Sequence, residues 1–167
     1  MRHFFVQVVA EEFKFEHLYD LCGEFSHKTI TVCCNTCRNV NWLTAKTQER
    51  GVTVCATSSD MDQPEHVRIA QEFEAGSCTI MITTTGLHWP NSDVIAEGSG
   101  GSGRVAINYD LPINAADYAH CFRQCGGMVV IHLVTATDVQ NLTGIMALYD
   151  IVIEELPRVP VVEEPRK

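Results

Sequence analysis

The chain has 167 residues, of which 46% are hydrophobic and 20% charged, a composition typical of one globular domain rather than of a disordered or fibrous protein. Its formal net charge is −9, from 12 basic and 21 acidic residues. Because an acidic surface repels phosphates, affinity for nucleic acid would have to come from a local concentration of basic groups.

Short apolar runs alternate with helical patterns along the chain. The runs predict strands at 3–9, 29–34, 52–57, 78–83, 104–109 and 128–134, and most are continuous, as in strands buried on both faces. Apolar residues at helical spacing predict helices over 15–25, over 115–125, from a cap at Asp62 to a stop at Gly76, and over 139–153 before Pro157. This order predicts a parallel α/β sheet with helices on both faces and with functional loops at the carboxyl ends of its strands.

Two segments depart from this alternation. Residues 84–104 lack any period and contain a glycine–serine tract at 98–103, which has the composition of a flexible linker. The tail is rich in proline, so we assign residues 1–157 to one domain and 158–167 to an extended or disordered tail. No apolar run reaches the roughly 18 residues of a membrane span, and the N-terminus lacks a secretory signal, so we expect an intracellular protein.

Most of the eight cysteines lie in apolar runs, where we expect reduced and buried thiols. Cys34 and Cys37 have the C-x-x-C spacing of a zinc or redox site, and residues 120–125 supply further histidine and cysteine side chains. We favour no metal, because Cys34 ends a strand predicted to be buried.

Six sequence segments occur in the same order as the motifs of a known family: FKFEHLYDL (13–21), CCNTCRNVNWL (33–43), DMDQPEHVRIAQEFEAG (60–76), IMITTT (80–85), INYDLP (107–112) and YAHCFRQCGG (118–127). They resemble the C-terminal RecA-like domain of DEAD-box RNA helicases, and within it the translation initiation factor four-A group. The resemblance covers the chain from Phe4 to about Pro157 except 87–104. It implies a three-layer α/β/α sandwich with a mostly parallel sheet, and a partner N-terminal RecA-like domain that holds the phosphate-binding loop absent from this sequence.

The resemblance also implies residue roles. Its RNA-binding positions correspond to Asn35, Thr36, Gln63, Thr83 and Thr84, although Asn35 or Thr36 could simply cap the following helix.

The nucleotide-facing positions lie in the later motifs. Asp93 would reach the ATP ribose, and Gln124 stands at an arginine-finger position. His120 either links the RNA and ATP sites or is a buried histidine that contacts a backbone carbonyl.

Several arginines of the family pattern are replaced. The substitutes are His66, Trp89 or its neighbours, Cys121, Gln124 and Gly127, and Thr85 stands in place of an aspartate. Because an arginine finger contributes about 10³–10⁵ in rate, we expect impaired ATP hydrolysis.

Three functions remain open: a working half of an RNA-dependent ATPase, an impaired paralogue that still binds RNA, and a scaffold for protein interaction in RNA metabolism. We favour the second. ATP and Mg²⁺ would then bind only together with the N-terminal domain, and this domain alone would be inactive and bind RNA weakly. Further expected partners are translation or RNA-processing factors, in the cytoplasm or alternatively the nucleus.

Overall fold

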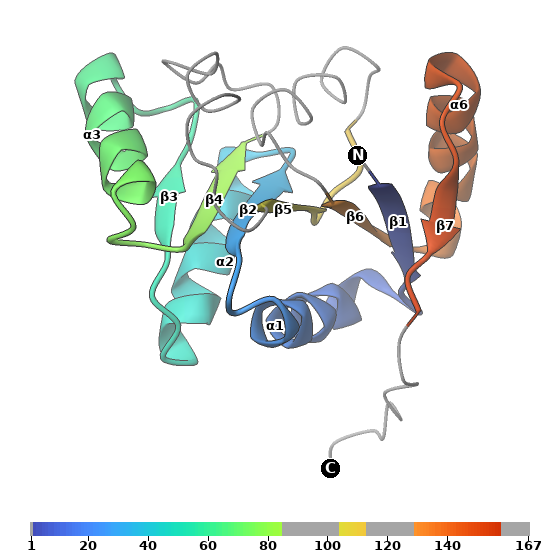
Figure 1. The fold of residues 1–167 in the computed structure, drawn as a ribbon, viewed down its shortest axis with the longest axis horizontal. Helices are drawn as coiled ribbons and strands as arrows, with labels where there is room; N and C mark the ends of the chain where they lie inside the picture. Colours follow the sequence, from blue (N-terminus) through green and yellow to red (C-terminus); the bar gives the residue numbers. More distant parts are fainter. Residues whose placement is uncertain (1, 85–103, 113–128, 158–167) are drawn as a thin grey trace.

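The computed structural model describes residues 2–84, 104–112 and 129–157. Within them, seven strands form one sheet in the order β3-β4-β2-β5-β6-β1-β7, and every neighbouring pair is parallel (Figure 1). The strands are β1 (Arg2–Gln7), β2 (Thr29–Cys34), β3 (Cys55–Thr57), β4 (Ile80–Thr84), β5 (Arg104–Asn108), β6 (Val129–Val134) and β7 (Ile153–Glu155). The predicted parallel α/β sheet is therefore confirmed.

Helices cover both faces of this sheet. On one face, α1 (Lys14–Glu24) and α2 (Cys37–Glu49) bury side chains such as Leu18 and Leu43 in the same core cluster as Ile82 of β4. On the other face, α3 (Gln63–Glu74) packs on Met81. At the far side of that face, α6 (Val139–Tyr149) packs on Val134 and Ile153. Two short 3₁₀ helices, η1 (Glu11–Phe13) and η2 (Ala136–Asp138), complete the described elements.

Helix ends follow the local signals of the sequence. The Asp62 carboxylate accepts a hydrogen bond from the Glu65 backbone N–H at 3.1 Å, and Gly76 after α3 adopts a φ of 83°, as predicted for a cap and a stop. Gly51 ends α2 in the same way, with a φ of 78°.

The prediction of a long final helix over 139–153 is wrong. The helix ends at Tyr149, because Asp150 takes a left-handed backbone with φ of 51°, and the chain then pairs beside β1 as β7. Ile153 keeps the apolar character that suggested a helix, but it is buried from a strand. The strand predicted over 52–57 begins only at Cys55, and the helix predicted over 115–125 lies outside the described residues.

All six cysteines of the described ranges are reduced, and Cys22, Cys33, Cys34 and Cys78 are buried, as predicted. In the same part of the chain, no helix combines the length and the apolar character needed to span a membrane.

Candidate functional site at the carboxyl ends of the strands

The turn after β2 is held by the loop that follows the neighbouring strand β5. The Asn35 backbone N–H donates to Asp110 Oδ2 at 2.9 Å, and the Asn35 side-chain amide donates to the Leu111 carbonyl at 2.8 Å. Asn39, in the first turn of α2, donates to the same Asp110 oxygen at 3.0 Å. One carboxylate oxygen therefore fixes both the turn and the start of the helix.

Thr36 is the N-cap of α2, because its hydroxyl accepts from the Asn39 backbone N–H at 3.1 Å. The capping alternative left open by the sequence is thus confirmed for Thr36. The residue is nevertheless exposed, and the first backbone N–H groups of a helix can bind a phosphate oxygen.

The turn after β3 lies beside this helix start. Cys37 Sγ and Ser59 Oγ are 3.2 Å apart, which brings the turns after β2 and β3 together. Gln63 follows as the first residue of α3, and it is exposed. Gln63 is therefore available to a ligand at this edge.

The two threonines at the end of β4, which the sequence predicts as phosphate-facing hydroxyls, are both buried. Thr83 is fully buried, and its hydroxyl lies 3.0 Å from that of Thr57 on the adjacent strand β3. Thr84 is 4% exposed, and its buried hydroxyl has no hydrogen-bond partner among the described residues. In this conformation, Thr83 faces its neighbouring strand and not the solvent.

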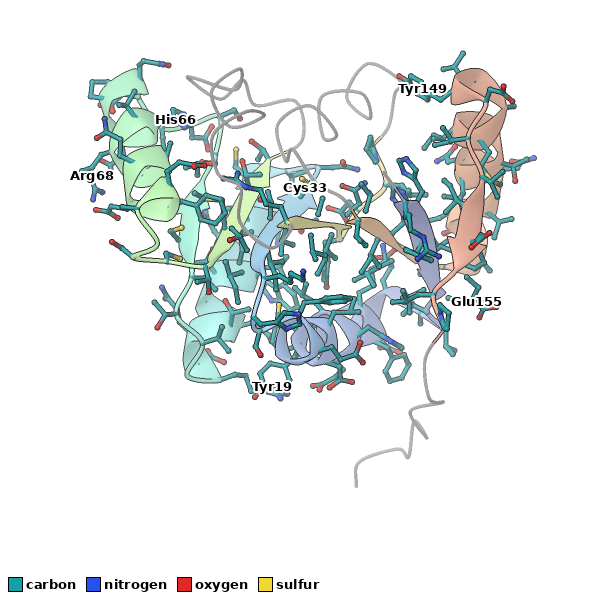
Figure 2. All side chains as sticks on the ribbon, viewed as in Figure 1. Tyr19, Cys33, His66, Arg68, Tyr149 and Glu155 are labelled. Carbon is teal, nitrogen blue, oxygen red and sulfur yellow. The ribbon has the colours of Figure 1, made fainter. Side chains whose placement is uncertain are left out.

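The remaining predicted positions divide between a buried residue and residues outside the described ranges. His66 lies on the buried side of α3, whereas Arg68 points outward on the same helix (Figure 2) and pairs with Glu65 and Glu72. The histidine at this arginine position therefore does not present its ring to solvent. Asp93, His120 and Gln124, together with the other replaced arginine positions Trp89, Cys121 and Gly127, lie outside the described residues.

Lys14 is a buried cation that the sequence analysis did not single out. Its side chain is 2% exposed, and its ammonium lies 3.0 Å from Glu11 Oε1 and 3.7 Å from Asp138 Oδ2. The ammonium also lies 5.7 Å from the centre of the Tyr109 ring. Burial is the main cause that raises the pKa of the Tyr109 hydroxyl, and the neighbouring Asp110 carboxylate is the second. Lys14 thus ties the segments after β1, β5 and β6 together, and no local pattern distinguishes it from a surface lysine.

A polar pair is buried deeper in the same sheet. The Asn108 side-chain amide and His132 Nδ1 are 3.0 Å apart on the adjacent strands β5 and β6. Burial lowers the pKa of His132 to about 3, with a smaller contribution from the nearby His3. Because an amide nitrogen can only donate, the neutral ring accepts at Nδ1.

The thiols that the structure describes do not favour metal binding. Burial, and then the Asp110 carboxylate, raise the pKa of Cys34, which disfavours the thiolate that a metal requires. Within the described ranges, no group of three potential metal ligands comes together.

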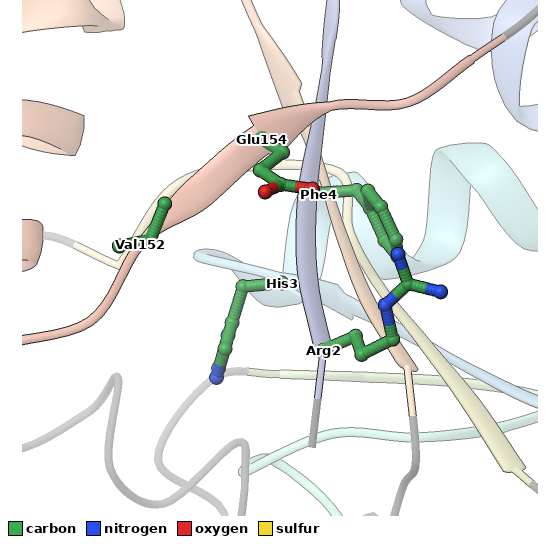
Figure 3. Close-up of a pocket in the computed structure, with 5 residues that line it drawn as sticks. All are labelled: Arg2, His3, Phe4, Val152 and Glu154. Carbon is green, nitrogen blue, oxygen red and sulfur yellow. The ribbon is translucent and has the colours of Figure 1, made fainter.

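A small pocket lies elsewhere, at the amino ends of β1 and β7 (Figure 3). Its volume is about 210 Å³, and it is lined by Arg2, His3, Phe4, Val152 and Glu154. The Arg2 guanidinium lies 4.9 Å from the centre of the Phe4 ring, so it already makes a cation–π contact within the domain. Functional loops of parallel sheets gather at the opposite, carboxyl ends, so we leave this pocket out of the candidate site.

Seven parallel strands between two helical layers, with polar turns gathered at their carboxyl ends, define a RecA-like α/β domain. Solved structures share this fold. The chain aligns with E. coli DEAD-box protein SrmB bound to regulator of ribonuclease activity A at a TM-score of 0.77 and 19% identity, over 100% of this chain and 98% of the other. It aligns with S. cerevisiae Dbp5 bound to RNA and ADP BeF3 at a TM-score of 0.78 and 24% identity, over 94% and 41%.

The model of the helicase conserved C-terminal domain matches residues 13–126, and the chain belongs to this family. Its curated relatives include eukaryotic initiation factor 4A-9 of Nicotiana tabacum, 38% identical over 94% of this chain and 37% of the relative. Another is ATP-dependent RNA helicase FAL1 of Mycosarcoma maydis, 36% identical over 94% and 39%. The domain is thus a DEAD-box C-terminal domain similar to those of the initiation factor 4A group, and it spans less than two fifths of these relatives.

Proposed function

We propose that this domain binds the backbone of single-stranded RNA at the carboxyl ends of β2 and β3 and closes over ATP together with an N-terminal RecA-like domain. The observation that carries the proposal is the hydrogen-bonded turn after β2. Asp110 holds Asn35 and the start of α2 in one arrangement, and exposed Thr36 lies between them. A turn held in this way can present polar groups to a phosphate with little loss of conformational entropy on binding.

Asn35, Thr36 and Gln63 are the contact residues that we propose first, because Thr36 and Gln63 are exposed and Asn35 is half-buried. Thr84 follows, since its hydroxyl has no hydrogen-bond partner within the described ranges, although it is buried. Thr83 would bind RNA only if its hydroxyl left Thr57.

We further propose that ATP hydrolysis is impaired. His66 is buried on α3, so it is a poor substitute for a phosphate-binding arginine. Cys121, Gln124 and Gly127 carry no cationic side chain, and a glutamine at the finger position offers a hydrogen bond without charge. ATP and Mg²⁺ would be held largely by the N-terminal domain, with Asp93 directed to the ribose and His120 between the two sites. We propose a role beside translation or RNA-processing factors in the cytoplasm, and the name eukaryotic initiation factor 4A of one relative supports the translation part.

RNA-stimulated ATP hydrolysis by the full-length protein that carries this domain tests the catalytic part. We expect turnover far below that of a relative with all motif arginines, and comparable turnover would overturn the impaired-enzyme proposal.

A titration of single-stranded RNA at low and moderate salt, with and without an ATP analogue, tests the binding part separately. We expect affinity that weakens as salt increases, because phosphate contacts release counterions. Absence of salt-dependent binding in both states would favour the alternative of a non-catalytic scaffold for protein interaction.

A further inference from the structure

A stripe of basic and aromatic side chains runs along the exposed side of α2. Arg38, Trp42 and Lys46 follow one another at four-residue intervals, which places them on the same side of the helix. We call these three residues the α2 stripe. It lies on the face of the sheet covered by α1 and α2, and it extends from the start of α2 away from the carboxyl-end turns (Figure 1).

The aromatic centre of the stripe is only partly covered. Trp42 is 46% exposed, and it meets the buried Phe15 of α1 edge to face, with ring centres 6.1 Å apart. The Lys46 ammonium lies 5.1 Å from the Trp42 ring centre and 5.2 Å from that of Phe15. Trp42 therefore packs on Phe15 while nearly half of its surface stays exposed, and tryptophan is enriched among the residues that contribute most to binding at protein interfaces.

The two cations of the stripe differ from the neighbouring Arg50 in their contacts with carboxylates. Within the described residues, neither Arg38 nor Lys46 forms an ion pair with a carboxylate. By contrast, Arg50, one turn further along α2, is paired with Glu16 of α1 and stacks on Tyr19. Glu16 thus pairs with Arg50, and the surface available to a partner extends from Arg38 to Lys46.

The two cations and the partly exposed tryptophan indicate the chemistry of the partner. Arg38 and Lys46, which form no ion pair among the described residues, make a local positive site on a protein with a net charge of −9 and can attract carboxylates. The exposed part of Trp42 offers apolar contact area beside them. The stripe is about 12 Å long at 1.5 Å per helical residue, which matches about four residues of extended peptide.

Single-stranded RNA fits this surface less well. Base recognition without sequence preference uses an open aromatic face for stacking, and Lys46 already lies over the Trp42 ring. Trp42 and Lys46 also lie more than one turn along α2 from its start, which is where we propose that RNA binds. We therefore propose that the α2 stripe is a docking site for a short acidic peptide segment of another protein, with an apolar residue placed between aspartate or glutamate side chains.

A selection from a library of random seven-residue peptides on the immobilised 167-residue chain tests this proposal. We expect enrichment of peptides with an apolar residue flanked by at least two acidic residues. Synthetic fluorescein-labelled copies of the enriched peptides should lose roughly tenfold in affinity with Trp42→Ala and with Lys46→Gln, the loss typical of one anchor or one close charge contact.

The matched control is Arg68→Gln, which removes an exposed charge from α3 on the opposite face. It should leave peptide affinity unchanged, and circular dichroism should show that all three variants are folded. The proposal is overturned if no peptide class is enriched, if the enriched peptides are not acidic, or if their affinity is the same for Lys46→Gln as for the parent chain.

A parallel titration with a labelled oligouridine distinguishes the two macromolecules. We expect Trp42→Ala and Lys46→Gln to leave RNA affinity within twofold. A loss of RNA affinity without a loss of peptide affinity would overturn the peptide assignment. Failure of RNA to bind any variant would count against the proposed function alone and leave the peptide result valid.

Discussion

Asp110 is the residue on which the proposed RNA-binding turn depends most directly. Its Oδ2 atom accepts from the Asn35 backbone N–H and from the Asn39 amide, and both donors lie more than 70 positions earlier in the chain. Asp110→Asn keeps the size of the side chain but weakens these charge-assisted bonds. We expect a loss of about 1–2 kcal/mol in the free energy of unfolding, measured by urea denaturation.

The sign of the change in RNA affinity tests the positioning role of the same residue. Removal of a carboxylate should by itself strengthen phosphate binding, whereas loss of a held turn should weaken it. We expect RNA affinity to fall about fivefold by fluorescence anisotropy. Asp150→Asn, at the exposed end of α6, is the control with the same charge change, and a higher affinity for Asp110→Asn would contradict the positioning role.

His132 makes the stability of the domain depend on pH. Its pKa is about 3 in the folded state against an ordinary value of 6.5, so the unfolded chain binds an extra proton between these values. The free energy of unfolding contributed by this group is therefore fully present above pH 6.5 and is lost as the pH falls below it. We expect a slope of up to about 1.4 kcal/mol per pH unit from this residue.

The difference between the parent chain and His132→Gln isolates this effect. Urea denaturation from pH 7.5 to 4.5 should show a shallower dependence for the variant, by about one proton. His27→Gln replaces an exposed histidine and should retain the parent slope. Parallel curves for the parent chain and His132→Gln would show that the buried ring does not control the acid response.

At the scale of elements, helix caps illustrate how local chemistry sets boundaries. Asp62 caps α3 through its side chain, and Pro64 lies in the first turn where its missing N–H costs nothing. We expect Asp62→Ala to lower the free energy of unfolding by about 1 kcal/mol in urea denaturation. Asp62→Asn retains an acceptor oxygen and should preserve most of that stability, so equal losses for both variants would point to charge rather than to the cap.

The end of α6 shows where element-level inference failed. Met146, Tyr149 and Ile153 continue a helical spacing, and the sequence offers no glycine or proline between them. The unpaired edge of β1 decided the outcome, because residues Ile153–Glu155 gain backbone hydrogen bonds there and Ile153 is buried. A strand of three residues leaves too short a pattern to recognise in advance.

At the scale of the whole molecule, the proposed impairment of ATP hydrolysis rests on the replaced motif arginines. Arginine in place of Cys121, Gln124 and Gly127 together, in the full-length protein, should restore charge stabilisation of the transferring phosphoryl group. We expect RNA-stimulated ATP hydrolysis to rise by about 10³-fold or more, since a finger is worth 10³–10⁵. The measurement is steady-state phosphate release at saturating RNA.

The control for that experiment is the same substitution measured without RNA, where coupling across the closed interface should keep the rate low. An unchanged rate with RNA would contradict the view that these three positions limit hydrolysis. It would place a further defect in the altered 87–104 segment or in the N-terminal domain.

The sequence by itself determined the alternation of strands and helices, the caps at Asp62 and Gly76, and the motif order that resembles the DEAD-box C-terminal domain, because these depend on neighbouring residues. Only the tertiary structure decided which groups meet across the sheet. Asn35 and Asp110 are joined because β2 and β5 are adjacent, and Thr83 is withdrawn from solvent because β3 lies beside β4. Such contacts follow from strand order, which brings distant residues together without leaving a local pattern in either segment.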